Sequence, residues 1–341
     1  MTRKMATIRR IEEVKAIPNA DKIVAYRVGG WWVVDSIGKY VVGDLVVYAE
    51  PDSFIPTAIA PFLTKPGQSA KTYGGVEGER LRTVSLRKQL SQGLLLPLVP
   101  TCDMIESELF EGLDVSMPLG IVKFEAEVPA CLAGEVRGLF PSVIPKTDQA
   151  RIQNLSAELK EWLCSGLTWE VTEKLDGSSM TVYINDGEIG VCSRNLDLKR
   201  NPDNSLWRAA IKYGLEEKLV ACGRNIAIQG ELIGNGIQGN MYKMRDQDFY
   251  VYDIYDIDAG RYFTPKERMG FVTQNMLTHC PVLMPSVEFD TETVESLLKM
   301  AEGETAMLGS NCQREGLVFK CHEKEVSFKC ISNTFLLTHD D

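Results

Sequence analysis

Hydrophobic and polar residues alternate in short runs along much of the chain, and glycine, proline and other turn residues separate the runs. Alternation over about four to eight residues is typical of a half-buried β-strand. In the first half, such runs lie in GGWWVVDSIG, GDLVVYAEPDSFIP and RLRTVSLRKQLSQGLLLPL. Several short strands with this punctuation predict a small β-barrel.

The second half mixes strand patterns with helical ones. Helical spacing occurs in SAELKEWLCSG, NSLWRAAIKYGLEEKLVAC and TETVESLLKMA, and strand patterns occur in TWEVTEKLDG, SMTVYIND, EIGVCSRN, NIAIQGELIG, DFYVYDIYD, EGLVFKC and VSFKCIS. A stretch rich in turn residues separates the halves. The sequence therefore predicts an α+β protein with a barrel domain over 1–127, a linker over 128–150 and a largely antiparallel-sheet domain over 151–341.

Alternation also assigns two charged residues to strand faces. In TWEVTEKL, Lys174 lies on the face opposite Val171 and stands just before the turn that contains Asp176. In NIAIQGELIG, Glu231 lies on the face opposite Ile228. Both are expected to avoid the apolar side of their strands, and each by itself also fits an ordinary strand-end charge.

The strand DFYVYDI carries two tyrosines. A period of two places Tyr250 and Tyr252 on the same face as Ile254, and Phe249 and Val251 on the other face. Taken alone, these aromatic residues fit a structural core.

Composition narrows the class of protein. With 341 residues, of which 44% are hydrophobic, the chain can bury a core of its own and is expected to form two domains. No run of about 18 apolar residues occurs, and the start MTRKMATIRR lacks the apolar region of a signal peptide. We therefore expect no membrane span, no targeting signal and a cytoplasmic or nuclear location.

The net charge of −10 argues against a protein coated in nucleic acid. Local basic patches remain, in the segment 80–88 (RLRTVSLRK) and in a second set further on. That second set consists of Arg194, Lys199, Arg200, Arg208 and Lys212. Solvated surface charge explains either patch taken alone.

The sequence argues against two kinds of site, a zinc site made by cysteines and a dinucleotide-binding glycine loop. The nine cysteines form no C-x-x-C pair, and the spacing of Cys312, Cys321 and Cys330 fits no zinc site, so reduced structural thiols are expected. The segment GNGIQG at 234–239 satisfies G-x-G-x-x-G, but the pattern after it predicts a loop and a strand. A dinucleotide-binding loop must open a helix.

Six short motifs stand in a recognisable order: K-L-D-G at 174–177, S-R-N at 193–195, G-E-L at 230–232, F-Y-V-Y-D-I at 249–254, E-G-L-V-F-K at 315–320 and S-F-K at 327–329. In this order they resemble the nucleotidyltransferase motifs of ATP-dependent polynucleotide ligases and mRNA-capping enzymes. VSFKCISNTF and GIQGNMYKMRDQDFYVYDI look most like RNA ligases.

The first half resembles a second module. AIPNADKI, VVGDLVVY and ERLRTVSLRKQLSQGLLLP are similar to OB-fold segments of the tRNA-binding type. An OB-fold placed before the nucleotidyltransferase domain is typical of one branch of RNA ligases. The resemblance thus implies an N-terminal OB-fold barrel followed by the ligase domain. Trp31 and Trp32 are candidates for RNA contact there, although the barrel core is an equal expectation for both.

The resemblance implies that Lys174 attacks the α-phosphorus of ATP and carries AMP as a phosphoramidate. The attacking amine must be neutral, and nearby cations would lower its pKa. A divalent cation, Mg²⁺ or Mn²⁺, is expected on Asp176, Glu231 and Glu315 through its waters, where it would offset their charge. The catalytic residues implied in this way are Lys174, Asp176, Glu231, Glu315 and Lys329.

Nucleotide contacts follow from the same resemblance. Glu231 would face the ribose, Tyr252 would stack on adenine, Arg194 would contact phosphates or the RNA end, and Lys329 would bind the α-phosphate. The full set expected to bind the nucleotide is Glu173, Lys174, Gly177, Arg194, Glu231, Tyr252, Lys320 and Lys329.

One position departs from the family pattern. Related ligases often show K-x-K in the last motif, whereas here the second position is Ile331. Lys320 is a candidate substitute, although regular alternation places it on the face opposite Glu315.

The implied function is an ATP-dependent RNA ligase that acts in RNA repair and joins a 3′-hydroxyl to a 5′-phosphate through lysyl-AMP and RNA-adenylate intermediates. Its expected partner is RNA, as a nicked duplex or as broken strand ends, and the expected state is a monomer. Two alternatives stay open. One is another covalent nucleotidyltransferase, either a DNA ligase or a GTP-using capping enzyme. The other is a non-catalytic RNA-binding relative.

Overall fold

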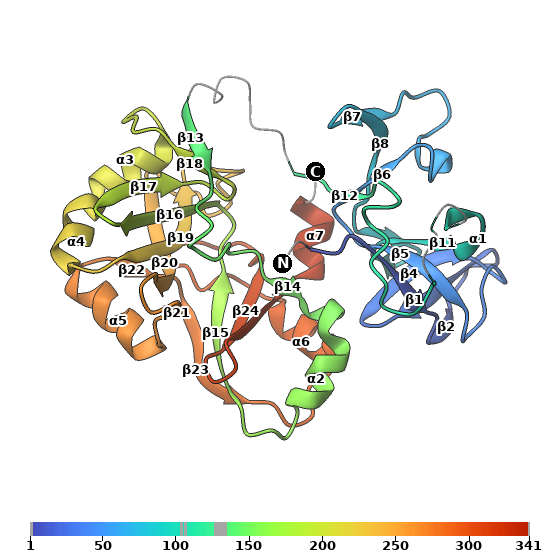
Figure 1. Cartoon of the computed structure of the whole chain (residues 1–341). Coiled ribbons are helices and arrows are strands. Elements are labelled where there is room, and N and C mark those ends of the chain that lie inside the picture. The colour runs from blue at the N-terminus through green and yellow to red at the C-terminus, as the bar shows by residue number, and fades with distance from the viewer. Residues whose placement is uncertain (1–2, 103–104, 106–107, 126–134, 340–341) are drawn as a thin grey trace. The chain divides into compact units, whose positions relative to one another are not determined.

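The computed structural model describes residues 3–102, 105, 108–125 and 135–339, and the chain divides into two compact units (Figure 1). The first unit comprises Met1–Glu127, Ile152–Lys160 and Leu336–Asp341. The second comprises Val128–Arg151 and Glu161–Phe335. Within the predicted linker, residues 136–139 and 150–151 form strands, and residues 128–150 fall in the second unit. The proposed domain bounds themselves stay a prediction.

The first unit is made of short, mostly antiparallel strands. These are β1 (Ala6–Arg10), β2 (Glu13–Ala16), β3 (Ile23–Val28), β4 (Trp31–Ser36), β5 (Leu45–Ala49), β6 (Ser53–Pro56), β7 (Lys71–Tyr73), β8 (Val76–Arg80), β9 (Val84–Leu86), β10 (Gln89–Ser91), β11 (Leu94–Pro97) and β12 (Val122–Lys123), with the 3₁₀ turn Pro61–Leu63 and helix α1 (Leu98–Thr101). They pair in the orders β1-β5-β11, β2-β3-β4, β12-β6-β8-β7 and β10-β9.

Strand β5 separates the two apolar cores of this unit. Val46 and Tyr48 pack into one core, and the alternate residues Val47 and Ala49 pack into the other. A strand buried on both faces has no polar positions to alternate with apolar ones, which accounts for the continuous run LVVYA.

The two tryptophans of β4 have different surroundings. Trp31 is 1% exposed, and its Nε1 donates a hydrogen bond to Asn154 Oδ1 at 2.7 Å. Trp31 is therefore a core residue, and the expectation that it contacts RNA is wrong for this position. Trp32 is half-buried, with Lys15 Nζ 5.7 Å from its ring centroid.

The elements from residue 136 onward are β13 (Val136–Leu139), β14 (Ala150–Arg151), the 3₁₀ turn Ile152–Leu155, α2 (Ser156–Trp162), β15 (Thr168–Lys174), β16 (Ser178–Asn185), β17 (Glu188–Cys192), β18 (Leu196–Leu198), α3 (Ser205–Lys212), α4 (Leu215–Cys222), β19 (Ile226–Gly234), β20 (Gln247–Asp256), β21 (Arg261–Tyr262), α5 (Pro265–Gln274), β22 (Thr278–His279), β23 (Val282–Glu288), α6 (Val294–Ala301), β24 (Gly316–Cys321), β25 (Val326–Ile331) and α7 (Asn333–His339). The strands and helices predicted after residue 150 all form, so the α+β class is confirmed.

The second unit contains two sheets. The larger runs β13-β18-β17-β16-β19-β20-β21 with β22 beside β20, and the smaller runs β14-β25-β24-β15-β23. Helices α3, α4 and α5 cover the outer face of the larger sheet (Figure 1). There Trp207 of α3, Leu219 of α4 and Val272 of α5 join one core with Val182 and Ile228 of the sheet. The inner face of the larger sheet is mixed, because it carries Glu231 and also apolar residues such as Tyr183 and Ala227.

Helix α5 was not predicted because its apolar residues have weak helical spacing. Its start nevertheless carries a sequence signal. Thr264 and Glu267 form a reciprocal capping box around Pro265, which occupies the first turn. The signature T-x-x-E would have located this helix. Helix α7 and strands β22 and β23 were also missed.

The G-x-G-x-x-G segment behaves as expected. Gly234 ends β19, and turns lead from there to β20, so no helix opens after the glycines. Among the described residues, no group of three or more His, Cys, Asp and Glu side chains is gathered as a metal cluster. None of the described helices combines the length and the apolar character needed to span a membrane.

An aromatic cluster fills one face of the smaller sheet. Phe328 is fully buried and stacks on Phe319 at 4.9 Å and on Trp162 at 5.8 Å between ring centroids. Trp169 and Phe289 stack beside them at 5.0 Å. This face is therefore the apolar wall of the sheet, and its other face is free for polar side chains.

We expect Phe328→Ala to lower the free energy of unfolding by about 3–5 kcal/mol, because it removes a fully buried ring and leaves a cavity. Urea unfolding followed by tryptophan fluorescence measures the loss. Leu308→Ala, at a fully exposed position, serves as the control and should change stability by less than about 0.5 kcal/mol. A loss at Phe328 as small as that of the control would contradict the cluster's role.

Candidate active site

Cross-strand pairing places Lys174 of β15, Lys320 of β24 and Lys329 of β25 on the same face of the smaller sheet. This face is opposite the aromatic cluster. It is turned toward the larger sheet, because Lys320 Nζ donates to the carbonyl oxygen of Tyr252 in β20 at 2.7 Å. The candidate active site therefore lies between the two sheets of the second unit.

Lys174 contacts a carboxylate directly. Its Nζ lies 2.5 Å from Glu315 Oε1, and its side chain keeps 26% of its surface exposed. Burial disfavours the charged amine, but attraction to Glu315, Glu231 and Asp176 outweighs this and raises the pKa of Lys174. Without a bound cation, the amine is therefore protonated at neutral pH, as a lysine among carboxylates must be.

The position of Glu315 corrects an expectation from alternation. Glu315 lies one residue before β24, and its carbonyl oxygen accepts a hydrogen bond from Ser332 N at 2.9 Å. Because it stands outside the regular strand, its carboxylate reaches Lys174 on the face that also carries Lys320. The predicted placement of Lys320 opposite Glu315 is therefore wrong.

Glu231 faces the site from β19 of the larger sheet. It pairs with Ser179 of β16, on the face predicted for it, while Ile228 lies in the helix-covered core. Burial raises the pKa of Glu231 to about 8, against the attraction of Lys174 and with the added repulsion of Glu315. At neutral pH, Glu231 therefore keeps its proton in the free protein, because the site already holds the charged carboxylate of Glu315 and disfavours a second one.

Gly177 allows the K-L-D-G turn to approach β19. A Cβ atom at this position would lie 2.4 Å from Leu232 O and 3.0 Å from Glu231 Cγ. The turn is also fixed at Asp176, whose backbone N donates to Tyr242 Oη at 2.8 Å. The absence of a side chain at Gly177 therefore brings the carboxylates of Asp176 and Glu231 to the same amine.

A β-bulge re-aims Tyr252. Gln229 pairs with Asp253 and the next residue, Gly230, pairs with Val251, so Tyr252 is the extra residue. The bulge reverses the alternation beyond it, and Ile254 joins the core of Val251 instead of the face of Tyr252. The predicted grouping of Ile254 with the tyrosines is wrong for this reason.

The bulge directs Tyr252 toward the site. Its hydroxyl lies 3.5 Å from Ser179 Oγ, and Glu231 is close enough to raise the pKa of the phenol further after burial has raised it. Lys320 Nζ lies 5.7 Å from its ring centroid. A ring held in this way can serve as a platform for a flat base.

Lys329 and Arg194 meet at Asp148, a residue that the sequence analysis missed. Lys329 Nζ is 2.9 Å from Asp148 Oδ1, and Arg194 Nη2 is 3.6 Å from the same oxygen. The charge of Arg194 also opposes the rise in the pKa of Glu231, which indicates that Arg194 lies near that carboxylate. Nothing in the pattern around Asp148 distinguishes it from an ordinary loop residue.

Glu173 and Lys320 lie away from Lys174. Glu173 is on the opposite face of β15, where its carboxylate accepts hydrogen bonds from Thr305 Oγ1 at 2.5 Å and from Ala306 N at 2.7 Å. Lys320 lies four residues along the sheet from the Lys174 position, roughly 13 Å at strand spacing. Their contact with a nucleotide stays a prediction.

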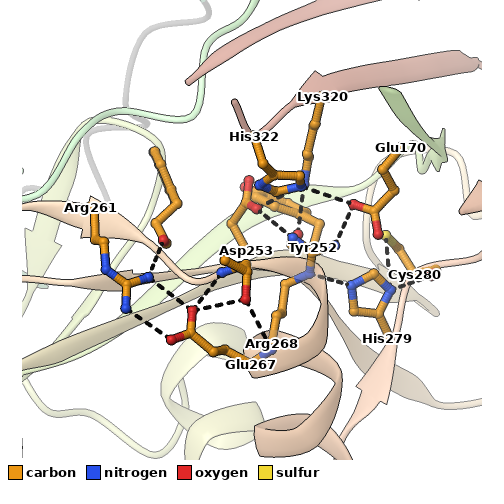
Figure 2. A network of polar contacts seen from close by, with 12 residues as sticks. Glu170, Tyr252, Asp253, Arg261, Glu267, Arg268, His279, Cys280, Lys320 and His322 are labelled. Atoms are coloured by element: carbon orange, nitrogen blue, oxygen red, sulfur yellow. Dashed lines mark hydrogen bonds and ion pairs between the residues drawn. The ribbon is translucent and has the colours of Figure 1, made fainter. Parts of the chain in front are cut away.

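Lys320 belongs to a buried ionic network with Arg268 at its centre (Figure 2). Lys320 Nζ is 2.8 Å from Asp253 Oδ1, Arg268 contacts both Asp253 and Glu170, and Arg268 Nε donates to His279 Nε2 at 2.9 Å. Burial and the nearby cations lower the pKa of His279 to about 4, so the ring is neutral and can accept this bond. The network fixes β20 directly beside the bulge.

The basic set after residue 190 is largely paired. Arg200 contacts Glu216 at 3.0 Å and Lys212 contacts Asp248 at 2.6 Å. Exposed pairs of this kind contribute little to stability. Of that set, Arg194 is the member that the structure places at the candidate active site.

A divalent cation fits this site if it keeps part of its water. No three acidic, histidine or cysteine side chains of the described residues are close enough to ligate one ion directly. The donors are carboxylates, which suit Mg²⁺ or Mn²⁺, and Glu315 Oε2 is buried without a hydrogen-bond partner among the described residues. A hydrated cation would satisfy that oxygen and favour the charged form of Glu231 beside it.

Comparison with known proteins agrees with the geometry. Residues 167–331 match the family model for RNA ligase, and residues 5–98 match a model for an OB-fold domain. A ligand-free mutant of Naegleria gruberi RNA ligase is 44% identical, covers 100% of both chains and has a TM-score of 0.90. No match was found among curated proteins.

Two further structures of the Naegleria gruberi enzyme are similar. A mutant solved with AMP and Mn is 44% identical, with a TM-score of 0.90 over 99% of this chain and 100% of that chain. The enzyme solved with PPi is 44% identical, with a TM-score of 0.89 over 100% of both chains. The predicted arrangement, an OB-fold barrel followed by a nucleotidyltransferase-type sheet domain, is confirmed.

We expect Glu231→Gln to stabilise the folded protein, by an amount that grows with pH. Because the pKa of Glu231 is raised from 4.5 to about 8, the folded state holds a proton that the unfolded chain has lost, and wild-type stability falls as pH rises through this window. Glu231→Gln has no carboxyl at this position and does not lose stability in this way. Its free energy of unfolding should exceed that of the wild type by the order of a few kcal/mol near pH 8, and the difference should then level off.

Urea unfolding at about pH 5, 7 and 9 measures this difference. Glu188→Gln, at an exposed position on β17, is the matched control and should show no comparable trend. An advantage of Glu231→Gln that is constant with pH, or a net destabilisation at about pH 9, would contradict the raised pKa assigned to Glu231.

Proposed function

The chain belongs to the RNA ligase family, and from this premise we propose how its active site joins RNA ends. It is an ATP-dependent RNA ligase that seals a 3′-hydroxyl to a 5′-phosphate. The observation that carries the mechanism is the contact of Lys174 with Glu315 at 2.5 Å, beside Glu231 and the Asp176 turn. These residues come from separate motifs of the sequence and converge on one amine.

The first step forms a bond between Lys174 Nζ and the α-phosphorus of ATP and breaks the α–β phosphoanhydride, which releases pyrophosphate. The amine must lose a proton to attack, and Glu315 is the acceptor nearest to it. Lys329 and Arg194 hold the phosphates, for which they must exchange their contacts with Asp148. Tyr252 stacks on the adenine and Glu231 faces the ribose.

Asp176, Glu231 and Glu315 would hold a Mg²⁺ or Mn²⁺ ion, which would supply positive charge that favours the neutral amine and stabilises the phosphate oxygens. The protein's own contribution is to place these carboxylates around Lys174 with Gly177 against β19. The proposed nucleotide site also includes Glu173, Gly177 and Lys320. Of these, Glu173 and Lys320 lie away from Lys174 and would support the site from neighbouring positions, Lys320 through its contact with Tyr252. Lys320 lies four residues along the sheet from the position of Ile331, which argues against its replacing the lysine absent there.

The two later steps transfer the nucleotide and seal the RNA. The RNA 5′-phosphate attacks the phosphorus of lysyl-AMP, which frees Lys174 and gives an RNA-adenylate with a 5′–5′ pyrophosphate. The RNA 3′-hydroxyl then attacks that RNA phosphate, and AMP leaves. Both RNA ends must be held in line for this last step.

We propose that the substrate is a nicked duplex or a broken RNA strand, in an RNA repair role, and that the enzyme acts as a monomer. We also propose an OB-fold domain over 1–127, a connection over 128–150 and a ligase domain over 151–341. The eight cysteines of the described residues are free thiols, which supports work in a reducing compartment, the cytoplasm or nucleus.

We expect α-labelled ATP with Mg²⁺ or Mn²⁺ to label the protein with one AMP at Lys174. Lys174→Ala should abolish labelling, because no other amine occupies its place beside Glu315. The same variant should keep measurable sealing of pre-adenylated RNA, a step that does not use the amine. Lys299→Ala, at an exposed position on α6, is the control. Label mapped to a different residue would exclude Lys174 as the nucleophile.

We expect sealing of an RNA nick and little sealing of the same nick made entirely of DNA, because the 2′-hydroxyl distinguishes the two at an RNA-binding site. Gel assays with each strand exchanged between RNA and DNA measure this. Equal sealing of DNA would indicate a DNA ligase. Labelling by GTP would indicate a capping enzyme, and no labelling by either nucleotide would indicate a non-catalytic relative.

A further inference from the structure

The strands β9 and β10 form a hairpin with a two-residue loop. Leu86 pairs with Gln89, so Arg87 and Lys88 are the two central residues of the turn. Their φ angles are 53° and 65°. Positive φ at both positions is the signature of a type I′ turn, the form that suits the twist of a hairpin.

The residues at this turn are unfavourable for its backbone. Type I′ turns favour Asn-Gly, because glycine and asparagine adopt positive φ at low cost. Arg87 and Lys88 carry long side chains and pay the steric cost of the left-handed region. Strain of this kind, kept at two adjacent positions, points to a function for the side chains themselves.

Both cations are exposed and available. Neither Arg87 nor Lys88 makes a side-chain hydrogen bond or an ion pair with any residue in the described ranges. The strand leading to them exposes Val84 and Leu86 at 43% and 41%. The exposed cations Arg200 and Lys212 are neutralised by carboxylates, whereas the tip places two uncompensated cations side by side.

The base of the hairpin is held firmly. Ser91 is 5% exposed, and its Oγ accepts a hydrogen bond from Val34 N at 2.9 Å. The next residue, Gln92, donates from its backbone N to Trp32 O at 2.8 Å. The tip is therefore presented on a short arm that is fixed to β4 of the first unit.

We propose that the tip formed by Arg87 and Lys88 binds the phosphate backbone of the RNA substrate. The inference rests on the proposed function, since RNA is the polyanion that this enzyme must hold. The chain carries a net charge of −10, which disfavours RNA at a distance, so contact must come from local cations without carboxylate partners. Phosphate binding needs no base contact and suits an enzyme that seals ends of many sequences.

The test is the double substitution Arg87→Asn with Lys88→Gly, which installs the favoured turn and removes both charges. Stability and RNA binding should then move in opposite directions. The midpoint of urea unfolding should rise, because the backbone strain is relieved. Affinity for a nicked RNA duplex, measured by fluorescence anisotropy, should fall several-fold, and the dependence of log affinity on log salt should become shallower by about two units.

Two variants control for charge and position. Exchanging the residues, Arg87→Lys with Lys88→Arg, keeps both charges and should keep RNA affinity. Lys266→Gln with Lys299→Gln removes two exposed cations from α5 and α6 and should leave affinity within about twofold. Formation of lysyl-AMP should be unchanged in every variant, since the first step involves no RNA.

Unchanged RNA affinity in the Asn-Gly variant would overturn the proposal, and so would an equal loss in the α5 and α6 control. Unchanged RNA affinity with an altered oligomeric state by sedimentation would also overturn it and assign the tip to a contact between copies. Absence of lysyl-AMP in the wild type would reject the proposed function separately, because RNA binding is measured without catalysis.

Discussion

Buried charge has to be compensated, and the active site gathers three carboxylates around a single lysine amine. Glu315 contacts the amine directly, Asp176 reaches it through a tight turn, and Glu231 faces it from the other sheet. Their combined field raises the pKa of Lys174, and burial, with added repulsion from Glu315 and Asp176, raises the pKa of Glu231. The free protein is therefore set to accept a cation, and much of the surrounding architecture serves to keep these groups together.

The two sheets divide this task between their faces. The smaller sheet seals its outer face with stacked aromatic rings around Phe328, and the larger sheet buries its outer face under helices. The polar groups of the candidate active site therefore lie in the space between the sheets, next to smaller apolar clusters. The Arg268 network fixes the bulged strand there, with Glu170 and Asp253 neutralising a guanidinium that has no exposed surface. Losing one member would leave the others buried and unpaired, which is strongly destabilising.

Alternation alone predicted the faces of β15 and β19 correctly, because both strands are regular from end to end. It failed at Ile254 and Glu315, where a bulge and a strand end interrupt the period. The motif order predicted which residues meet, but not that the carboxylate of Glu173 is turned away and bonded to Thr305. Asp148 lay beyond prediction, because its contact with Lys329 joins residues 181 apart in the sequence and no local pattern encodes such a distance.

The contacts of Asp148 change how phosphate binding should be understood. A nucleotide that reaches Lys329 and Arg194 does not meet two free cations but replaces a carboxylate already bound to them. Association is thus an exchange of one anion for another, and its free energy is a difference between two similar terms. Nucleotide binding at such a site releases fewer counterions than binding in an open cationic pocket. We therefore expect the affinity for the nucleotide to be modest and to depend only weakly on ionic strength.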